Sequence, residues 1–311
     1  MISFRYHLVS IVAVFLALGL GLLAGTTVLD QELINRLRDQ TEGAQTRSAE
    51  LRTQVGELQS QIGQLEGFTE AVLPYLATGR LSGREVIILT QEGVDGAVLA
   101  EARDALDAAD AVVVAELAVT PKMASSDTGA QQELADVLGI LAPADPGSLP
   151  LQAATALAER LATETGLETD PAAPDLLRDL LAQNFLIPNG SGISDATIGE
   201  IGGGGQVVVV LAGGQSEPFL APESFMVPLV TTLVVRGVPV AAAEGTETTY
   251  PFVELLRAGD AAAIGAIVTV DDLDRTIGGV ALVLGLQELV TTGQGGDYGV
   301  KDGAALIPPL P

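Results

Sequence analysis

The sequence contains no cysteine and no tryptophan, and its only histidine, His7, lies close to the N-terminus. The missing thiol excludes a disulfide framework, a thiolate metal site and a cysteine nucleophile. One histidine leaves little of the usual acid–base machinery, and HExxH, CxxC and serine–histidine combinations are all absent. We therefore predict that the protein is not an enzyme and that it carries no cofactor.

Basic residues are also scarce, because 15 Lys and Arg stand against 40 Asp and Glu, for a formal net charge of −25. So acidic a chain has nothing with which to neutralise a row of phosphates, which excludes a nucleic-acid partner. It is equally unsuited to docking on anionic lipid headgroups. The acidity favours a well-solvated surface, and a weak reservoir for cations is the alternative.

Charge is missing altogether from residues 8–29, which follow a short N-terminal tail, residues 1–7. At about 1.5 Å per residue, a helix of this length crosses a hydrocarbon core of roughly 30 Å. A cleaved signal peptide is the alternative, but its apolar region is usually only about 7–15 residues long. Residues 22–26 are also a poor cleavage site. We predict a signal anchor that crosses the cell membrane once.

The orientation of this anchor is not decided by charge, because Arg5 before it is balanced against Arg36 and Arg38 beyond it. The short N-terminal tail favours an inside N-terminus and an extracytoplasmic globular domain. Gly21 and Gly25 form a GxxxG pattern on one face of the predicted span. This pattern can let two anchors approach each other closely.

Residues 30–73 carry a seven-residue repeat, which predicts a coiled coil. One row of the repeat is rich in β-branched residues and the other in leucine, a combination that favours a parallel two-stranded coil. The heptads next to the anchor are weak, and the distal ones are strong. A heteromeric coiled-coil partner is one alternative to a parallel homodimer, and a helix packed on its own domain is another. The predicted interface is formed by Leu51, Val55, Leu58, Ile62 and Leu65.

Residues 84–292 have the pattern of an α/β domain, with short apolar runs that alternate with helical segments. The five predicted strands are 84–90, 111–119, 206–212, 238–243 and 266–270, and the predicted helices between and after them are 94–109, 222–236, 252–257 and 278–291. This alternation predicts a doubly wound, mainly parallel, Rossmann-like sheet. A helical insertion, 129–190, contributes three further helices at 131–140, 151–165 and 174–185. We expect the Gly/Pro-rich tail, 293–311, to be extended or disordered.

Two loops at the predicted carboxyl edge of the sheet are rich in glycine, and ligands bind at this edge in such folds. The glycines of residues 90–96 could cradle a phosphate at a helix start, but Glu92 and Asp95 would repel it. Residues 212–216 likewise lack a complete phosphate motif. Turn and cap chemistry is the favoured interpretation of both loops.

A third loop at this edge is acidic, with Asp271, Asp272 and Asp274 in succession after a strand. Three carboxylates could hold a hard cation such as Mg²⁺. The same side chains are good N-caps for the helix that contains Ile277. We favour the capping role.

Two end segments carry a family resemblance: MISFRYHLVSIVAVFLALGLGLLAGTTVL, followed by the heptads, and TVDDLDRTIGGVALVLGLQELVTTGQGGDYGVKDGAALIPPLP at the C-terminus. Both resemble the actinobacterial MctB family of copper transport proteins. The resemblance implies an envelope protein with one anchor and a role in copper efflux or homeostasis. The alternative is a non-catalytic scaffold in envelope assembly or cell division that acts through its coiled coil.

The residues give this copper role little direct chemistry. Cu(I) prefers thiolates and thioethers, and Cu(II) prefers imidazoles. Apart from the initiator, the methionines are Met123 and Met226, far apart in sequence, and we expect them to fill the core or the surface. The metal ligands are therefore unknown, and copper is implied by the family alone. A copper role would need oligomerisation or a partner.

Overall fold

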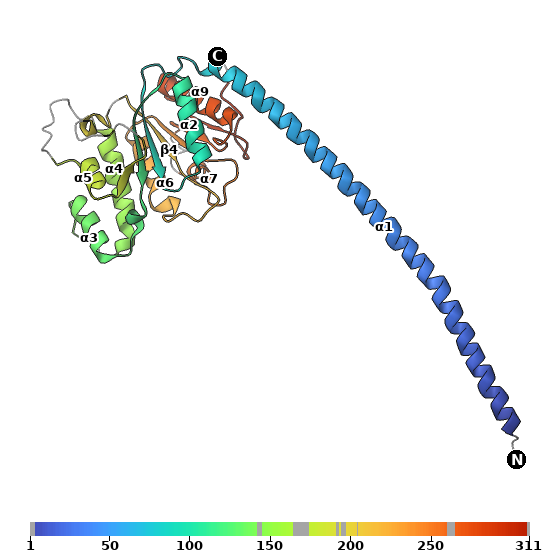
Figure 1. The fold of residues 1–311 in the computed structure, drawn as a ribbon. Helices are drawn as coiled ribbons and strands as arrows, with labels where there is room; N and C mark the ends of the chain where they lie inside the picture. The colour runs from blue at the N-terminus through green and yellow to red at the C-terminus, as the bar shows by residue number, and fades with distance from the viewer. Residues whose placement is uncertain are drawn as a thin grey trace. The chain divides into compact units, whose positions relative to one another are not determined.

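The computed structural model describes residues 4–141, 145–163, 174–190, 193, 197–203, 205–259 and 265–309. The chain divides into two compact units, residues 1–65 and residues 66–311. One helix, α1 (Phe4–Ala77), makes up the described part of the first unit and continues into the second (Figure 1). It extends four residues beyond residue 73, the predicted end of the coiled coil. We call residues 66–311 the globular unit.

The globular unit contains a seven-stranded sheet in the order β3-β2-β1-β4-β5-β6-β7. Neighbouring strands are parallel except for β3, which runs antiparallel to β2. The α/β class and the mainly parallel sheet are therefore confirmed. The strands are β1 (Glu85–Gln91), β2 (Val112–Val119), β3 (Leu186–Pro188), β4 (Val207–Leu211), β5 (Val240–Ala243), β6 (Ile267–Val270) and β7 (Gly296–Tyr298).

The five strands expected from the sequence correspond to β1, β2, β4, β5 and β6, but the two edge strands are differences from the prediction. β3 lies inside the predicted helical insertion, and β7 lies inside the predicted Gly/Pro-rich tail. Both are only three residues long, and glycine or proline occupies one of the three positions in each. Segments this short give no periodic signal in the sequence. Because β7 belongs to the sheet, the sheet extends beyond residue 292, the predicted end of the α/β domain.

Both faces of the sheet are buried, which explains why its strands are continuous apolar runs without polar alternation. Along β1, Ile87 and Leu89 belong to the core on one face, and Val86 and Ile88 belong to the core on the other. Figure 1 shows helices in layers on the two sides of the sheet. α2 (Gly96–Ala108) and α9 (Thr276–Thr292) pack together on one side, while α4 (Leu149–Ala162) and α6 (Met226–Val235) pack together on the other.

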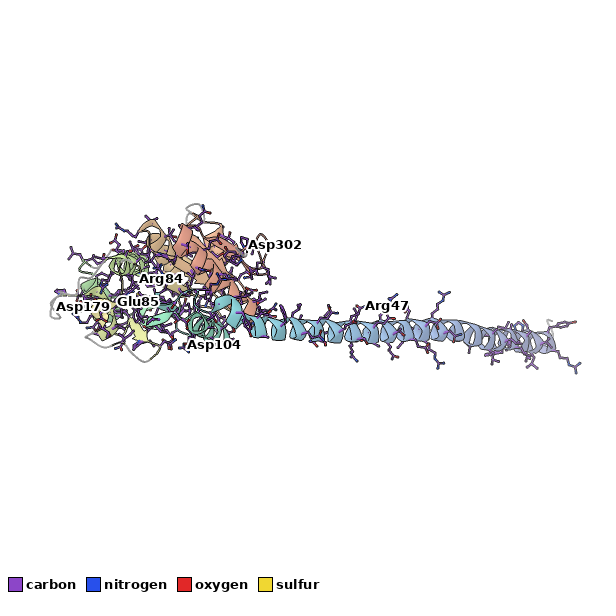
Figure 2. The ribbon with its side chains drawn as sticks, turned by 90° about the horizontal axis from the view of Figure 1, so that it is seen from above. Arg47, Arg84, Glu85, Asp104, Asp179 and Asp302 are labelled. Carbon is purple, nitrogen blue, oxygen red and sulfur yellow. The ribbon has the colours of Figure 1, made fainter. Side chains whose placement is uncertain are left out.

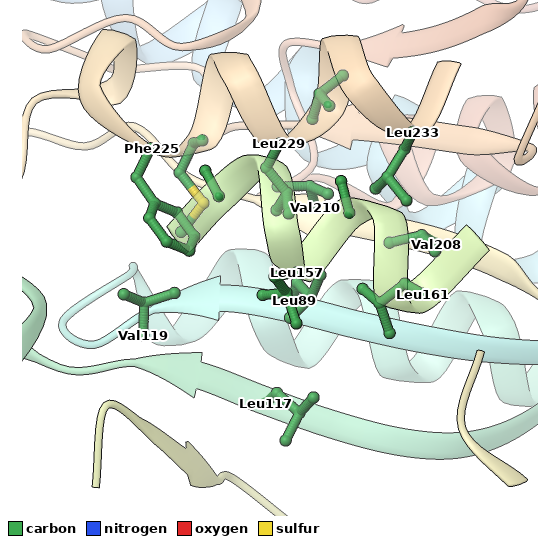
Figure 3. Packing of buried hydrophobic residues seen from close by; sticks show 14 of the residues in the cluster. Leu89, Leu117, Val119, Leu157, Leu161, Val208, Val210, Phe225, Leu229 and Leu233 are labelled. Carbon is green, nitrogen blue, oxygen red and sulfur yellow. The ribbon is translucent and has the colours of Figure 1, made fainter. Parts of the chain in front are cut away.

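The larger core, on the α4 and α6 side, joins the sheet to both helices (Figure 3). Leu89 and Leu117 come from the strands, Leu157 from α4, and Phe225 and Leu229 from the segment that forms α6. Each of these side chains is essentially inaccessible to solvent. Burial of one such side chain contributes about 1.5–3 kcal/mol, so this layer is a main source of the unit's stability.

The helical insertion contains α3 (Thr128–Val137), α4 and α5 (Leu176–Ala182), which agrees with the three helices expected there. Residues 164–165 of the second predicted helix lie outside the described residues. Arg160 on α4 organises this part of the unit, because its Nε donates to Asp175 Oδ2 at 2.8 Å and its Nη1 donates to Ile201 O at 2.8 Å. Asp175 also caps α5 by accepting from Leu177 N at 2.9 Å. Short helices complete the unit: α7 (Val253–Arg257) and the 3₁₀ turns η1 (Pro121–Ala124), η2 (Pro146–Ser148), η3 (Ile198–Glu200) and η4 (Pro222–Ser224).

Residues 79–83, which lie between the predicted coiled coil and the predicted α/β domain, are packed into the globular unit. Leu81 is buried in the core on the α2 side together with Ala77, the last residue of α1. The backbone N–H of Leu81 donates to Ala109 O at 3.1 Å. The end of α1 is therefore fixed to the globular unit by core packing and backbone hydrogen bonds.

Candidate functional site

The first part of α1 has the composition of a membrane span. Its segment from Arg5 to Gly25 is 21 residues long with a mean hydropathy of 2.6, which is long and apolar enough to cross a membrane. The side chains of residues 5–25 are exposed, and those of residues 26–34 are not described. A Cβ added at Gly21 or Gly25 would meet no atom within 4 Å, so this face of the helix is open to close approach.

Farther along α1, the structure places all five predicted interface residues on one exposed apolar stripe. Their exposed fractions run from 46% at Ile62 to 66% at Leu65. The spacing of four and three residues keeps them on one side of the helix, as in coiled coils. We call the residues 51, 55, 58, 62 and 65 the α1 seam. Their pairing with a partner stays a prediction.

A polar position of the repeat, between the anchor and the seam, is accommodated within the helix itself. Thr41 Oγ1 donates to Leu37 O at 2.7 Å, so its hydroxyl needs no partner from another chain. Figure 2 shows Arg47 projecting from α1, and Asp104 and Asp302 projecting from the globular unit. Arg47, Asp104 and Asp302 are exposed at the surfaces of their units.

The side chains with copper-binding chemistry do not form a site in the described residues. Met123 and Met226 are 2% and 1% exposed and belong to the same apolar core, which confirms that they act as core fillers. Among the residues that the structure describes, no group of three or more His, Cys, Asp or Glu side chains is placed to hold a metal ion.

Charged side chains do gather at the carboxyl edge of the sheet, where they form two buried ion pairs. The first joins Glu244, after β5, to Lys301 near the C-terminus, with Nζ and Oε1 at 2.5 Å. Glu244 is fully buried, and its Oε2 accepts from the backbone N–H groups of Phe252 and Val253 at 2.6 and 3.1 Å. Every oxygen of this buried carboxylate is therefore satisfied, as a buried charge requires.

The second ion pair joins Asp271, directly after β6, to Arg257 at the end of α7. Arg257 Nη1 donates to Asp271 Oδ2 at 2.5 Å, and Asp271 Oδ1 accepts from the backbone of Val300 at 2.7 Å. Arg257 also donates to the backbone oxygen of Tyr298 at 2.9 Å. The two ion pairs together hold the C-terminal segment against the sheet, so its described residues, 293–309, are part of the fold.

The helix-capping role that we favoured for the acidic loop is not found in the described structure. Asp274 accepts from both N and Oγ1 of Thr246 at 2.7 Å, and Asp271 is occupied by Arg257. The N-cap of α9 is Arg275, whose side chain makes no capping hydrogen bond. The capping prediction was therefore wrong, because Asp271 and Asp274 bind residues that are distant in sequence.

Asp272, the remaining aspartate of this loop, is a buried carboxyl group without compensation. It is fully buried, and neither of its side-chain oxygens has a hydrogen-bond partner among the described residues. Burial, reinforced by the neighbouring charge of Asp271, raises the pKa of Asp272 to about 6. The protein therefore favours a protonated Asp272 in mildly acidic solution.

The two glycine-rich loops lie side by side and line one cleft, at the carboxyl ends of β1 and β4. The loop after β4 passes directly over Glu244: a Cβ on Gly213, whose φ is +83°, would lie 2.7 Å from Glu244 Oε2. Only glycine fits there. The cap interpretation of the first loop is confirmed, since Asp95 Oδ1 accepts from Ala97 N at 2.9 Å at the start of α2.

Sequence comparison identifies the family. The family model described as "Copper transport outer membrane protein, MctB" matches residues 1–309, nearly the whole chain. The chain belongs to the MctB family. The proteins named copper transporter MctB from Mycobacterium bovis and Mycobacterium tuberculosis are each 27% identical to it over 319 residues, which cover 99% of both chains. Their counterpart from Mycobacterium leprae is 28% identical over 325 residues, again 99% of both chains.

The MctB match covers both units, so the apolar helix and the globular unit belong to one family architecture. Sequence reasoning missed the basic members of the two buried ion pairs, Arg257 and Lys301. One signal for Lys301 was present, since the chain has only two lysines and this one lies in the C-terminal segment that carries the resemblance. Arg257 gave no such signal, because its partner follows a different strand.

Proposed function

We propose that this MctB-family chain is a single-span envelope protein that acts as a parallel dimer in copper efflux or homeostasis. The observation that carries the proposal is the combination, on one helix, of an apolar membrane-length segment and the exposed α1 seam. The family match over residues 1–309 is the reason for proposing copper as the transported ion. We assign residues 8–29 to the anchor and residues 30–73 to the coiled coil.

Dimerisation is favoured by physical proximity as well as by apolar burial. Two copies anchored in one membrane emerge from the same face, which fixes a parallel orientation and raises their effective concentration. Glycines in the coil, such as Gly56 and Gly63, each cost about 1 kcal/mol relative to alanine. A coiled coil of moderate stability depends most on the membrane anchor to hold its two helices together. A second protein with matching heptads is the alternative partner for the seam.

The globular unit is proposed to be a doubly wound, Rossmann-like domain on the extracytoplasmic side. The reversal of strand order between β1 and β4 and the helices on both faces of the sheet support the assignment. The family description names the outer membrane, whereas the apolar helical segment from Arg5 to Gly25 is the reason for proposing the cell membrane.

We propose that a single copy of the chain does not bind copper by itself. Among the described residues, no group of three or more His, Cys, Asp or Glu is placed to hold a metal ion, and the two internal methionines are buried in the core. Copper would therefore be handled by the assembled dimer or by a partner that the coil positions. This makes an intact seam necessary for copper homeostasis.

Copper content in a deletion strain tests this function. The strain is complemented with the wild-type chain, with Leu58→Asp in the α1 seam, or with Ser60→Asp on the opposite side of the same helix. We expect the deletion to accumulate copper, and we expect the wild type and Ser60→Asp, but not Leu58→Asp, to restore the normal content. Normal copper content in the deletion strain, together with misshapen or unseparated cells, would refute the copper role and favour the scaffold.

A further inference from the structure

The loop between β6 and α9, residues 271–275, holds the C-terminal segment, residues 293–309, in place. Asp271 Oδ1 accepts from the backbone N–H groups of Val300 and Lys301 at 2.7 and 3.1 Å. We call residues 271–275 the β6–α9 loop. The position of the C-terminal segment therefore depends on the position of this loop.

The β6–α9 loop is also tied to the loop that follows β5. The backbone N–H of Leu273 donates to Glu244 O at 3.0 Å, and Asp274 Oδ1 accepts from Thr246 N and Oγ1 at 2.7 Å. Glu244 in turn forms the ion pair with Lys301 of the C-terminal segment. A displacement of the β6–α9 loop would thus act on the segment through both Asp271 and the loop after β5.

Asp272 is a buried acid in the middle of this loop, and its side chain makes none of these contacts. It is fully buried, and neither of its carboxyl oxygens has a hydrogen-bond partner among the described residues. A Cβ on Gly278 would lie 2.9 Å from Asp272 Oδ1, so the carboxyl group is packed closely against the first turn of α9. Ionisation of Asp272 therefore places a buried charge without hydrogen bonds inside the loop.

The basic side chains near Asp272 compensate its charge only in part. The charged side chains around the loop come from the loop itself, from α2, from α7 and from the C-terminal segment: Asp271, Asp274, Arg275, Glu101, Arg257 and Lys301. The last two are already paired with other carboxylates. Burial and then Asp271 raise the pKa of Asp272, and their effect outweighs that of Arg275, which lowers it.

We propose that Asp272 makes the β6–α9 loop a proton-dependent latch for the C-terminal segment. When Asp272 is protonated, the loop carries no internal repulsion and holds the segment through Asp271. When Asp272 is ionised, it repels the neighbouring Asp271 inside the protein, and local opening of the loop relieves this repulsion and releases Val300 and Lys301. Opening would leave β6 without β7 at the edge of the sheet.

The direction of the pH dependence follows from the raised pKa. The pKa of Asp272 rises from 3.8 to about 6 in the closed loop, and we take the open loop to have the ordinary value. The closed state then binds more protons than the open state between these values, so it loses stability as pH rises through this window. The segment is held most firmly in acid and is released more often near neutral pH.

Amide hydrogen exchange of the full chain in neutral detergent, followed by mass spectrometry, tests the proposal in the peptide that contains Val300 and Lys301. Wild type and Asp272→Asn are compared at the same pH, so the intrinsic pH dependence of exchange cancels. We expect the ratio of wild-type to variant exchange rates to rise about 20-fold between about pH 4.5 and about pH 7.5, as a pKa shift from 3.8 to about 6 requires. Asp302→Asn, at an exposed position of the same segment, is the matched control and should show no such rise against wild type.

The buried strand β4 reports on unfolding of the whole unit in the same experiment. At about pH 7.5 we expect the wild-type segment to exchange at least about tenfold faster than β4 after correction for intrinsic rates, because local opening needs less free energy than global unfolding. Asp272→Leu, which also lacks the carboxyl group, replaces Asp272→Asn if the asparagine variant is unstable.

Three outcomes would overturn the proposal. One is a ratio of wild-type to Asp272→Asn exchange rates that stays constant with pH. Another is an equal rise in the ratio of wild-type to Asp302→Asn rates, which would indicate a general effect of acidic charge. The third is equal protection of the segment and β4 in the wild type, which would show that the segment is released only when the whole unit unfolds.

Discussion

Replacing Asp272 by asparagine removes a buried negative charge that the described structure does not compensate. The side chain is fully buried, and neither oxygen has a hydrogen-bond partner. Burial is the main cause that raises its pKa to about 6, and Asp271 and Asp274 add to the effect while Arg275 opposes it. The ionised form is therefore less stable in the folded protein than in the unfolded chain.

The sign and size of the effect follow from this shift. The pKa rises from 3.8 to about 6 on folding, so the folded state binds more protons than the unfolded state between these values. Stability is then lost as pH rises through this window, and above it the ionised Asp272 destabilises the protein by about 3 kcal/mol, at about 1.4 kcal/mol per pKa unit. Asparagine has no such pH dependence, although its amide can itself lack partners.

Urea unfolding of wild type and Asp272→Asn at several pH values measures the difference. We expect the stability of the variant relative to wild type to rise by about 2 kcal/mol between about pH 4.5 and about pH 7.5. Asp302→Asn, which changes an exposed aspartate, is the matched control and should show little change with pH. A relative stability for Asp272→Asn that stays constant over this range would refute the claim that Asp272 is buried without compensation.

Three further predictions concern other parts of the chain. Leu58→Asp is expected to make the full chain in detergent monomeric by sedimentation, because burial of each seam leucine contributes about 1.5–3 kcal/mol. Ser60→Asp should leave the dimer intact. A dimer that survives Leu58→Asp would argue against the seam. Lys301→Ala should destabilise the globular unit by about 3 kcal/mol in urea unfolding, because it leaves the buried Glu244 unpaired; an unchanged midpoint would contradict this. Gly285→Val should lower the melting temperature, because a Cβ there would lie 2.9 Å from both Tyr298 and Val268. If the variant melts at the same temperature as the wild type, α9 packs differently.

The regular part of the fold was accessible from the sequence because burial on both faces leaves a strong local signal. β4, for example, is Val-Val-Val-Val-Leu and is buried along its whole length, so its apolar run alone indicates a central strand. β7 has the sequence Gly-Asp-Tyr and is recognised only through its pairing with β6. Edge strands of this length depend on tertiary contacts that no local pattern contains.

The candidate sites also divide into those with a local sequence pattern and those that depend on tertiary contacts. The α1 seam is periodic, so its five residues could be named in advance, and the structure places them on one face of the helix. The acidic loop was recognised, but its roles were not. Asp271 is paired with Arg257 and Asp274 with Thr246, and these partners come from other loops. The spacing of residues in the sequence cannot show which basic side chain or hydroxyl group the fold places next to a given carboxylate.

Crosslinking in cells tests most directly the central claim, that α1 pairs in parallel and in register through its seam. The chain has no cysteine, so Leu58→Cys introduces the only thiol. In a parallel dimer the two copies of residue 58 face each other, and mild oxidation should give a disulfide-linked dimer with Leu58→Cys but not with Ser60→Cys. Equal crosslinking of both variants, or none with Leu58→Cys, would contradict the claim.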